Sequence, residues 1–270
     1  MDWLQVKRGD APLVVSFPHT GTDIPLEIEG VLTSPWLARK DTDWWVETLY
    51  DFATGLGAST VRTAISRTVI DVNRDPSGAS LYPGQATTEL CPTTTFDGEP
   101  LYLPGQEPDA PEITRRRATW FEPYHAALTA EIERLLHVHG KVVLYDAHSI
   151  RSRIPRLFEG ELPTLNIGAN SGASCDPALS RSIEAVCAAS GFSHVLNGRF
   201  KGGWTTRRYG APQDGVHAIQ MELACRGYMA DPEEPQTADT WPSPFDPAGA
   251  APMRAALTDV LKAALAFARV

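Results

Sequence analysis

The amino-acid sequence predicts an α/β fold in which a mixed, largely parallel sheet lies between two layers of helices, a three-layer sandwich. Three observations predict it. Short apolar or β-branched runs alternate along the chain with longer stretches whose apolar residues recur at helical spacing. The 270 residues, 43% of them hydrophobic, suffice for a substantial core. No repeat, low-complexity tract or Gly/Ser linker divides them, so we expect a single domain over residues 1–270.

The first half of the chain predicts three strands and one helix. Proline and glycine end the first strand, and a serine followed by proline begins the helix, as is usual at a helix N-terminus. β-branched residues dominate the other two strands. The expected bounds are Leu13–Phe17 for the first strand, Ser34 to about Gly55 for the helix, and Ala58–Thr63 and Thr68–Asn73 for the remaining strands.

The segment from Arg74 to Pro111 is dense in Pro, Gly and Thr. A loop of that length in a compact domain is usually functional, often as a lid or as the wall of a site. Helical spacing returns from Glu112 to His139, and Gly140 is expected to cap that helix. The remaining expected elements are strands at Lys141–Tyr145, Thr164–Gly168, Ser193–Leu196 and Val216–Leu223, and helices at Pro177–Ala189 and from about Pro252 to Ala268.

Charge and cysteine usage exclude several classes of protein. The 24 basic against 33 acidic residues give a net charge of −9, which argues against nucleic acid or an anionic membrane surface as the main partner. No apolar run is long enough for a transmembrane helix, and the N-terminus lacks the features of a signal peptide. Because Cys91, Cys175, Cys187 and Cys225 are scattered, we expect a reduced, cytoplasmic protein.

Two histidines directly follow predicted strands. His19 comes after the first strand, and His148 follows the apolar run that ends at Tyr145. Open α/β sheets place their sites at the carboxyl ends of strands. Imidazole is the commonest metal ligand, and catalytic zinc takes three protein ligands and water. We therefore expect one divalent metal ion, with Zn²⁺ as the expected species.

The acidic ligand has several candidates. Asp43 lies on an otherwise apolar face of the expected helix, where an acid is costly unless it is paired or binds a cation. Asp41 lies on another face of that helix. Asp146 shares a strand face with His148 and either binds the ion or orients an imidazole. The alternative for Asp43 is a buried acid that pairs with an arginine.

Glu222 lies near the end of an apolar strand, which suggests a general base or, alternatively, a structural ion pair. A small group of arginines is expected to bind a small anion, because the guanidinium fork matches a carboxylate. An adjacent arginine pair is otherwise often part of a solvated loop. The arginines are Arg67, Arg74, Arg207 and Arg208.

The sequence resembles the N-formylglutamate deformylase (N-formylglutamate amidohydrolase) family over most of its length. The resemblance rests on long blocks of unusual composition, among them PHTGTDIP, DTDWWVETLYDF, SRTVIDVNRDPSG, LCPTTTFDGEPLY, LYDAHSIRS, GGWTTRRYG and HAIQMELA. One departure is Trp45, where the family commonly has histidine. The resemblance implies a sandwich similar to zinc carboxypeptidase-like and phosphorylase/hydrolase-like folds. The H-x-x-E ligand pair of the carboxypeptidases is absent, because Thr22 lies three residues after His19.

This resemblance implies hydrolysis of N-formyl-L-glutamate to formate and L-glutamate, the last step of a histidine degradation route. The implied partner is thus a small dicarboxylate substrate. The implied roles are metal binding by His19, Asp43 and His148, general-base catalysis by Glu222, oxyanion stabilisation by an arginine or His217, and binding of the substrate carboxylates by Arg67, Asn73, Arg74, Arg207 and Arg208. Two alternatives stay open: another zinc-dependent N-acyl amino acid deacylase or carboxypeptidase-like hydrolase, and a non-catalytic dicarboxylate-binding protein.

Overall fold

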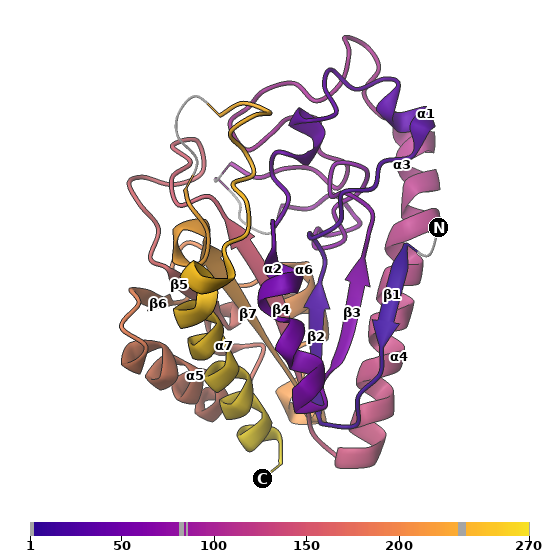
Figure 1. Ribbon diagram of the computed structural model, residues 1–270. Coiled ribbons are helices and arrows are strands. Elements are labelled where there is room, and N and C mark those ends of the chain that lie inside the picture. The colour runs from indigo at the N-terminus through magenta and orange to yellow at the C-terminus, as the bar shows by residue number, and fades with distance from the viewer. Residues whose placement is uncertain (1–2, 81–83, 85, 232–235, 270) are drawn as a thin grey trace.

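A computed structural model describes residues 3–80, 84, 86–231 and 236–269 (Figure 1). Its centre is a seven-stranded sheet with the order β1-β3-β2-β4-β7-β5-β6. In that order the strands are β1 (Leu4–Lys7), β3 (Ser59–Thr63), β2 (Leu13–Phe17), β4 (Val142–Ile150), β7 (Val216–Ala224), β5 (Leu165–Gly168) and β6 (His194–Leu196).

The sheet is mixed and largely parallel, as predicted. β3, β2, β4 and β7 run in one direction. β1 is antiparallel to β3, β5 is antiparallel to β7, and β6 is parallel to β5. Long loops gather beyond the carboxyl ends of the central parallel strands (Figure 1). The residues that end these strands therefore meet at one edge of the sheet, which is where α/β folds place their sites.

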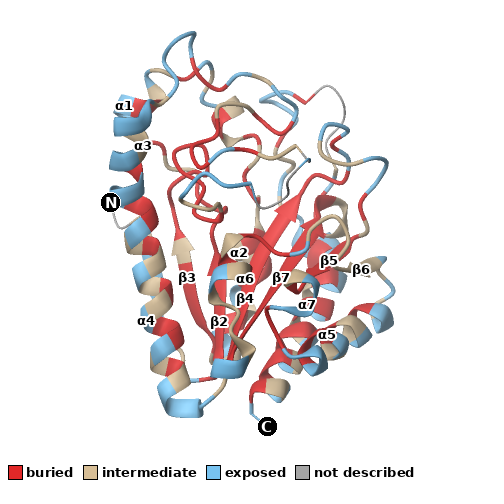
Figure 2. Ribbon diagram, turned by 180° about the vertical axis from the view of Figure 1, so that it is seen from behind, coloured by how far each residue is buried: buried red, intermediate tan, exposed pale blue. Residues whose placement is uncertain are grey.

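Helices cover both faces of the sheet, which confirms the expected α/β sandwich. One face packs against α2 (Val46–Leu49), α5 (Pro177–Ala189) and α7 (Pro247–Ala268). The other face packs against α4 (Glu122–His139) and α6 (Trp204–Tyr209). Figure 2 shows that the strands between these layers are buried and that the helices expose their outer sides.

The ends of the long helices follow from the sequence. Asp176 and Asp246 cap α5 and α7, each by accepting a hydrogen bond from a backbone N–H of the first turn. Gly140 ends α4 with a φ of 72°, as predicted. The remaining helical segments are short: α1 (Leu26–Glu29), α3 (Ala110–Arg116), the 3₁₀ segments η1 (Leu37–Arg39), η2 (Asp51–Leu56), η4 (Asn170–Gly172), η5 (Pro212–Asp214) and η6 (Cys225–Gly227), and the π-helical turn η3 (Arg117–Phe121).

The single helix expected from Ser34 to about Gly55 does not form. The chain instead makes η1, a turn, α2 and η2. Trp45 has a φ of 63°, which no continuous helix allows, and its indole N–H donates to the carbonyl of Ser243. The Asp43 N–H donates to the carbonyl of His19 at 3.0 Å. Tertiary hydrogen bonds therefore override the local helical pattern.

The strand expected at Thr68–Asn73 is also wrong, because this segment is a buried turn. The Asp71 N–H donates to the carbonyl of Leu90 at 2.7 Å, and no sheet ladder forms. Val69, Ile70 and Val72 are nevertheless buried in the core beneath α4. β-branched residues fill this core without extending the sheet, and the turn directs Asp71 toward the end of β2.

Other differences are smaller. β1 is an edge strand that is mostly exposed, so it carries no apolar pattern, and it was not expected. β4 continues to Ile150, which places His148 within the strand rather than after it. α7 begins at Pro247 rather than Pro252. Cys91, Cys175, Cys187 and Cys225 are all buried free thiols.

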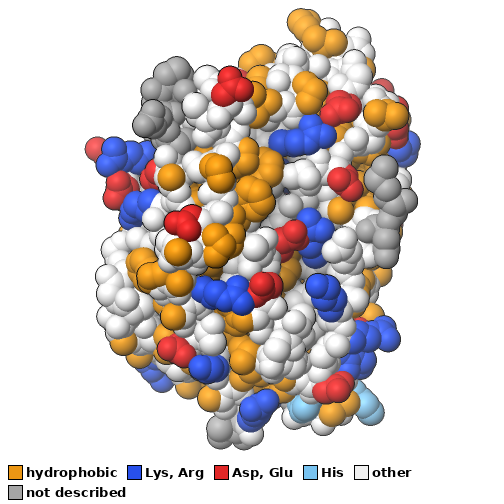
Figure 3. Space-filling model, in the orientation of Figure 1, with side chains coloured by type: hydrophobic (Ala, Val, Ile, Leu, Met, Phe, Trp, Pro, Cys, Tyr) orange, Lys and Arg blue, Asp and Glu red, His pale blue; other side chains and the backbone are white. Residues whose placement is uncertain are grey.

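Two features of the described residues bear on the expected partners. None of their helices is both long and apolar enough to cross a membrane. On the face that Figure 3 shows, acidic and basic side chains are interspersed rather than gathered into one basic patch.

Candidate metal centre and substrate cleft

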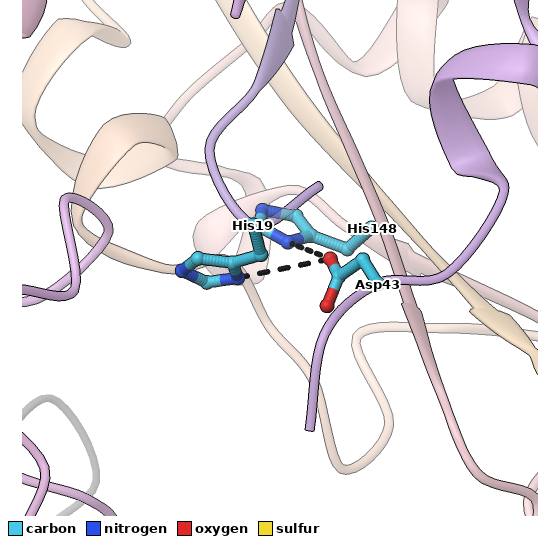
Figure 4. Close-up of side chains that lie close together, drawn as sticks. All are labelled: His19, Asp43 and His148. Carbon is cyan, nitrogen blue, oxygen red and sulfur yellow. Dashed lines mark hydrogen bonds and ion pairs between the residues drawn. The ribbon is translucent and has the colours of Figure 1, made fainter. Parts of the chain in front are cut away.

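His19, Asp43 and His148 converge beyond the carboxyl end of β2 (Figure 4). Their potential ligand atoms all lie within 4.8 Å of one another, and all three residues are buried. Asp43 Oδ2 lies 3.0 Å from His148 Nδ1 and 3.7 Å from His19 Nδ1. The structure thus brings together the three residues predicted as metal ligands, although Asp43 comes from a turn and not from a helix.

Two further carboxylates hold the opposite nitrogens of the imidazoles. His19 Nε2 lies 2.6 Å from Asp71 Oδ1, and His148 Nε2 lies 3.0 Å from Asp146 Oδ2. Because a carboxylate accepts a hydrogen bond, each Nε2 is placed to donate its N–H to a carboxylate. Both Nδ1 atoms face Asp43. Burial opposes the charged form of His148, but Asp146 and Asp43 raise the pKa of that ring well above its ordinary value, so an ion bound at Nδ1 would replace a proton there. This carboxylate–histidine arrangement is typical of metal ligands. Of the two roles considered for Asp146, binding the ion or orienting an imidazole, its position beside His148 Nε2 favours the second.

The donor set fits a divalent cation. Two imidazoles and one carboxylate match the ligands of catalytic zinc sites. Asp43 Oδ1 is buried and has no hydrogen-bond partner among the described residues. The Arg67 guanidinium lies 3.6 Å from this oxygen and offsets part of the cost of burying it, so the arginine pair considered for Asp43 is present beside the two histidines. Asp41, the competing acid, instead pairs with Arg151 at 3.2 Å.

Two arginines, Arg67 and Arg74, balance the negative charge around the two histidines. Arg67 binds Asp71 Oδ2 at 2.7 Å and lies 3.6 Å from Asp43 Oδ1. Arg74 Nε lies 3.6 Å from Asp71 Oδ2. Burial disfavours the charged form of Asp71, but His19, Arg67 and Arg74 together hold the pKa of that carboxyl well below its ordinary value. Asp71 is therefore an anion that can orient His19 at any neutral pH.

Asn73 was expected in the substrate clamp, and its side chain is engaged within the protein. Its Nδ2 donates to Asp146 Oδ2 at 3.1 Å, and its Oδ1 accepts from the Thr205 N–H at 2.8 Å. A Cβ on Gly203 would lie 2.4–2.7 Å from atoms of the Asn73 amide, so only glycine allows this approach. Asn73 thus lines the cleft while it orients Asp146 and the start of α6.

A cleft opens beside the two histidines. It has about 600 Å³ of empty volume, its open mouth included. Part of its wall comes from the segment Arg74–Pro111, as expected for that loop. The lining residues are His19, Arg67, Asn73, Arg74, Ala86, Thr87, Thr88, Phe96, His148, Ser149, Ile150, Leu157, Arg199, Phe200, Gly203, Gln220 and Glu222.

Glu222 reaches this cleft from β7. It is the register partner of His148 on β4, so the two side chains lie next to each other on the same face of the sheet. Gln220 donates from Nε2 to Glu222 Oε2 at 2.9 Å, and the Gly203 N–H fixes that amide by donating to Gln220 Oε1. Burial raises the pKa of Glu222 to about 7. The structural ion pair considered for Glu222 does not form with any described residue.

The predicted arginines separate into two groups. Arg67 and Arg74 line the cleft, whereas Arg207 and Arg208 do not. Arg207 Nε donates to the carbonyl of Gly202 at 2.9 Å, and Arg208 is exposed with its guanidinium over the Tyr209 ring. Neither arginine is among the described residues that line the cleft, so the expected contact with substrate gains no support for this pair.

His217 does not take its expected place. It lies near the start of β7, on the face that packs against α7, whereas Glu222 is near the end of β7 on the opposite face. Its Nδ1 accepts a hydrogen bond from the Asp176 N–H at 3.0 Å, and its ring packs edge-on against Phe267. His217 does not line the cleft and cannot stabilise an oxyanion there.

Sequence reasoning missed Asp71, Gln220 and Arg199. The signal for Asp71 was present, because an acid within an apolar run is the same observation that singled out Glu222. Gln220 and Arg199 are a polar strand residue and a loop residue, and no local pattern distinguishes them from others of their kind.

Comparison with known proteins gives a consistent result. Residues 11–229 match the model of the family described as N-formylglutamate amidohydrolase. The chain is 52% identical over 227 residues to the N-formylglutamate deformylase of Pseudomonas aeruginosa, which covers 84% of this chain and 85% of that protein. It is 48% identical over 231 residues to the N-formylglutamate deformylase of Pseudomonas putida, with 85% and 86% covered. The crystal structure of an N-formylglutamate amidohydrolase from Ralstonia eutropha superposes with a TM-score of 0.76 at 23% identity, over 99% of this chain and 97% of that one.

Proposed function

The chain belongs to the N-formylglutamate amidohydrolase family, and on this premise we propose that it hydrolyses N-formyl-L-glutamate to formate and L-glutamate in the cleft described above. One observation carries the proposal. Two imidazole Nδ1 atoms and a buried carboxylate converge beside Glu222, a buried acid with a raised pKa. Metal ligands beside a general base are the groups that metal-assisted hydrolysis of an amide requires. The reaction would serve as the last step of a route of histidine degradation.

The residues that would hold a divalent ion are His19, Asp43 and His148. Imidazole and carboxylate ligands in a set of three favour Zn²⁺ in a catalytic site. When bound, such an ion supplies Lewis-acid chemistry, since it polarises a carbonyl group and acidifies water. Asp71 and Asp146 keep the two imidazoles in the tautomer that this requires.

Glu222 is the proposed general base. In its ionised form it accepts the proton of the water that adds to the formyl carbon, and it then delivers that proton to the leaving nitrogen of glutamate. Gln220 restrains one carboxylate oxygen, Oε2, by its hydrogen bond. The proton is therefore expected on Oε1. Because the pKa of Glu222 is about 7, the side chain can both take up and release a proton near neutral pH.

Arg67 and Arg74 are the proposed cationic groups of the cleft. Arg67 is buried beside Asp43 and Asp71 and stacks on the Phe96 ring at 4.8 Å. Its fixed positive charge offsets the negative charge that develops on the formyl oxygen. The Arg74 side chain is 20% exposed at the wall of the cleft, where its guanidinium can bind a carboxylate of the dicarboxylate substrate.

Formate release is the measurement that tests this proposal. The purified protein would be assayed with the N-formyl, N-acetyl and N-carbamoyl derivatives of L-glutamate, before and after chelation and after Zn²⁺ is added back. We expect turnover of the N-formyl substrate alone, lost on chelation and restored by Zn²⁺. Preferred turnover of another acyl group would identify a different deacylase, and binding without turnover would identify a dicarboxylate-binding protein.

A further inference from the structure

Arg199 is a cleft residue that the reaction described above does not use. It lies in the loop after β6, and its side chain lines the cleft. Its Nε donates to the carbonyl of Leu157 at 2.9 Å, and its guanidinium also reaches the carbonyl of Ala86 at 3.3 Å. The same guanidinium lies over the Phe200 ring at 5.3 Å. These contacts hold a positive charge in a defined place on the cleft wall.

Arg74 and Arg199 hold the same stretch of that wall. Arg74 donates to both the carbonyl and the hydroxyl of Thr88, at 3.1 and 2.9 Å, whereas Arg199 donates to Ala86, two residues earlier. Their other neighbours differ. Arg74 lies 3.6 Å from Asp71, the carboxylate that orients His19. The contacts described for Arg199 all lie outside the metal centre. Of the three arginines that line the cleft, Arg67 and Arg74 thus lie beside the carboxylates of the candidate metal centre, whereas the described contacts of Arg199 are with another part of the wall.

Apolar residues contribute to the cleft wall beside Arg199. Leu157 and Phe200, which hold Arg199, both line the cleft, and Ile150 lines it as well. A ligand that reaches Arg199 therefore needs a hydrocarbon segment before its anionic group, because methylene groups gain by packing on apolar side chains.

The substrate of the proposed function has this form. In N-formyl-L-glutamate the α-carboxylate is attached to the carbon that bears the reacting nitrogen, whereas the γ-carboxylate lies beyond two methylenes. We infer that Arg74 binds the α-carboxylate and that Arg199 binds the γ-carboxylate. Arg199 then determines the preference for glutamate over uncharged side chains. This inference rests on the proposed function and assigns a specificity residue within it.

The test compares Arg199→Met with the parent protein on two substrates. Methionine retains an apolar side chain of similar length and removes the charge and the donors. With N-formyl-L-glutamate we expect kcat/KM to fall about 10- to 100-fold, the range for loss of a charge-assisted hydrogen bond. With N-formyl-L-glutamine we expect little change. The glutamate-to-glutamine preference should therefore largely disappear, and Arg199→Lys should restore only part of it, because an ammonium lacks the planar fork.

Arg156→Met is the matched control. Arg156 also donates to backbone carbonyls of a wall segment, those of Thr95 and Phe96 at 3.3 and 3.4 Å, but it is exposed and does not line the cleft. This variant should keep the parental preference. Thermal unfolding of both variants checks that they fold.

The outcomes separate the inference from the proposed function. Suppose that the parent hydrolyses N-formyl-L-glutamate. If Arg199→Met then keeps the parental preference for glutamate over glutamine, or if its kcat/KM falls equally for both substrates, the assignment of Arg199 is overturned and the proposed function stands. If the parent releases no formate, the proposed function fails. Calorimetric binding of the same two compounds to the parent and to Arg199→Met then decides the assignment: it survives only if the parent discriminates between them and the variant does not.

Discussion

At the scale of single residues, the candidate metal centre depends on side chains that would not themselves touch an ion. Asp71 and Asp146 fix the two imidazoles through Nε2, and Arg67 keeps Asp71 and Asp43 close together by its positive charge. All of these groups are buried, so the surrounding water cannot weaken their interactions. The ligand geometry is therefore set before an ion arrives.

Removal of the Asp71 charge should weaken metal binding. In Asp71→Asn the side chain can still accept from His19 Nε2, but it no longer raises the basicity of the ring or pairs with Arg67. We expect the affinity for Zn²⁺ to fall about 10- to 100-fold, as measured by competition with a chelating dye. Asp75→Asn, in the same segment, is the control and should bind as the parent does, because the described hydrogen bonds of the Asp75 side chain both go to Ser77. Equal affinities for both variants would mean that Asp71 does not orient His19.

Glu222→Gln should retain Zn²⁺ and substrate but lose turnover about 10²- to 10⁴-fold, since the amide cannot accept a proton. The parent should also lose activity as pH falls. The base must be ionised, burial raises its pKa to about 7, and protonation below that pH removes it. A bound cation lowers this pKa, so the acid limb should have its midpoint at or below about pH 7. The limb should be absent from the residual activity of the variant. Loss of the metal from Glu222→Gln would instead make Glu222 a ligand.

At the scale of elements, ion pairs of the buried Arg151 join the loops that carry the site. Arg151, directly after β4, binds Asp41 at 3.2 Å and Asp97 at 2.7 Å. Asp41 also accepts the Phe96 N–H at 2.6 Å. The network thus ties the turn that holds Asp43, two residues from Asp41, to the strand that holds His148 and to the loop that forms the cleft wall. These loops need such contacts because they have no regular structure of their own.

Arg151→Met should destabilise the protein by about 1.5–3 kcal/mol, because Asp41 loses its charged partner while Asp97 keeps its ion pair with Lys40 at 2.7 Å. Urea unfolding would measure this. Arg153→Met is the control: the Arg153 side chain is 72% exposed in its pair with Glu161, so the change should stay within about 0.5 kcal/mol. If the two variants are equally stable, the network does not hold the loops.

At the scale of the whole molecule, the sheet brings distant segments together. The β4 and β7 strands are aligned so that His148 pairs with Glu222. The β2 and β4 strands are aligned so that Ser16 pairs with Asp146. An ion held by His19, Asp43 and His148 would link the end of β2, the turn before α2 and β4. Metal binding and global stability should therefore be coupled, since an ion that binds only the folded state stabilises it.

Addition of Zn²⁺ to the chelated protein should raise Tm. At free metal about 100 times Kd the stabilisation is about 2.7 kcal/mol, which corresponds to roughly 5 °C for a chain of this size. Scanning calorimetry would measure the shift. His148→Ala should show no shift, while Glu222→Gln should respond like the parent. A Zn²⁺ shift that persists in His148→Ala would place the ion elsewhere.

The sequence alone determined the features that depend on local patterns. Leu13–Phe17 and Pro177–Ala189 form the elements predicted for them, because an apolar run and a capped amphipathic segment carry their signal within a few residues. The family blocks likewise predicted His19, Asp43 and His148 as one group. They did so despite a wrong helix around Asp43, since the identity of a residue does not depend on the backbone that carries it.

Only the tertiary structure decided which polar residues meet. It chose Asp43 over Asp41 and Asp146, moved His217 to the far face of the sheet, turned Arg208 outward and brought Arg199 to the cleft. The physical reason is that strand register and loop hydrogen bonds between residues far apart in the chain set these distances. A sequence pattern with a range of a few residues contains no information about them.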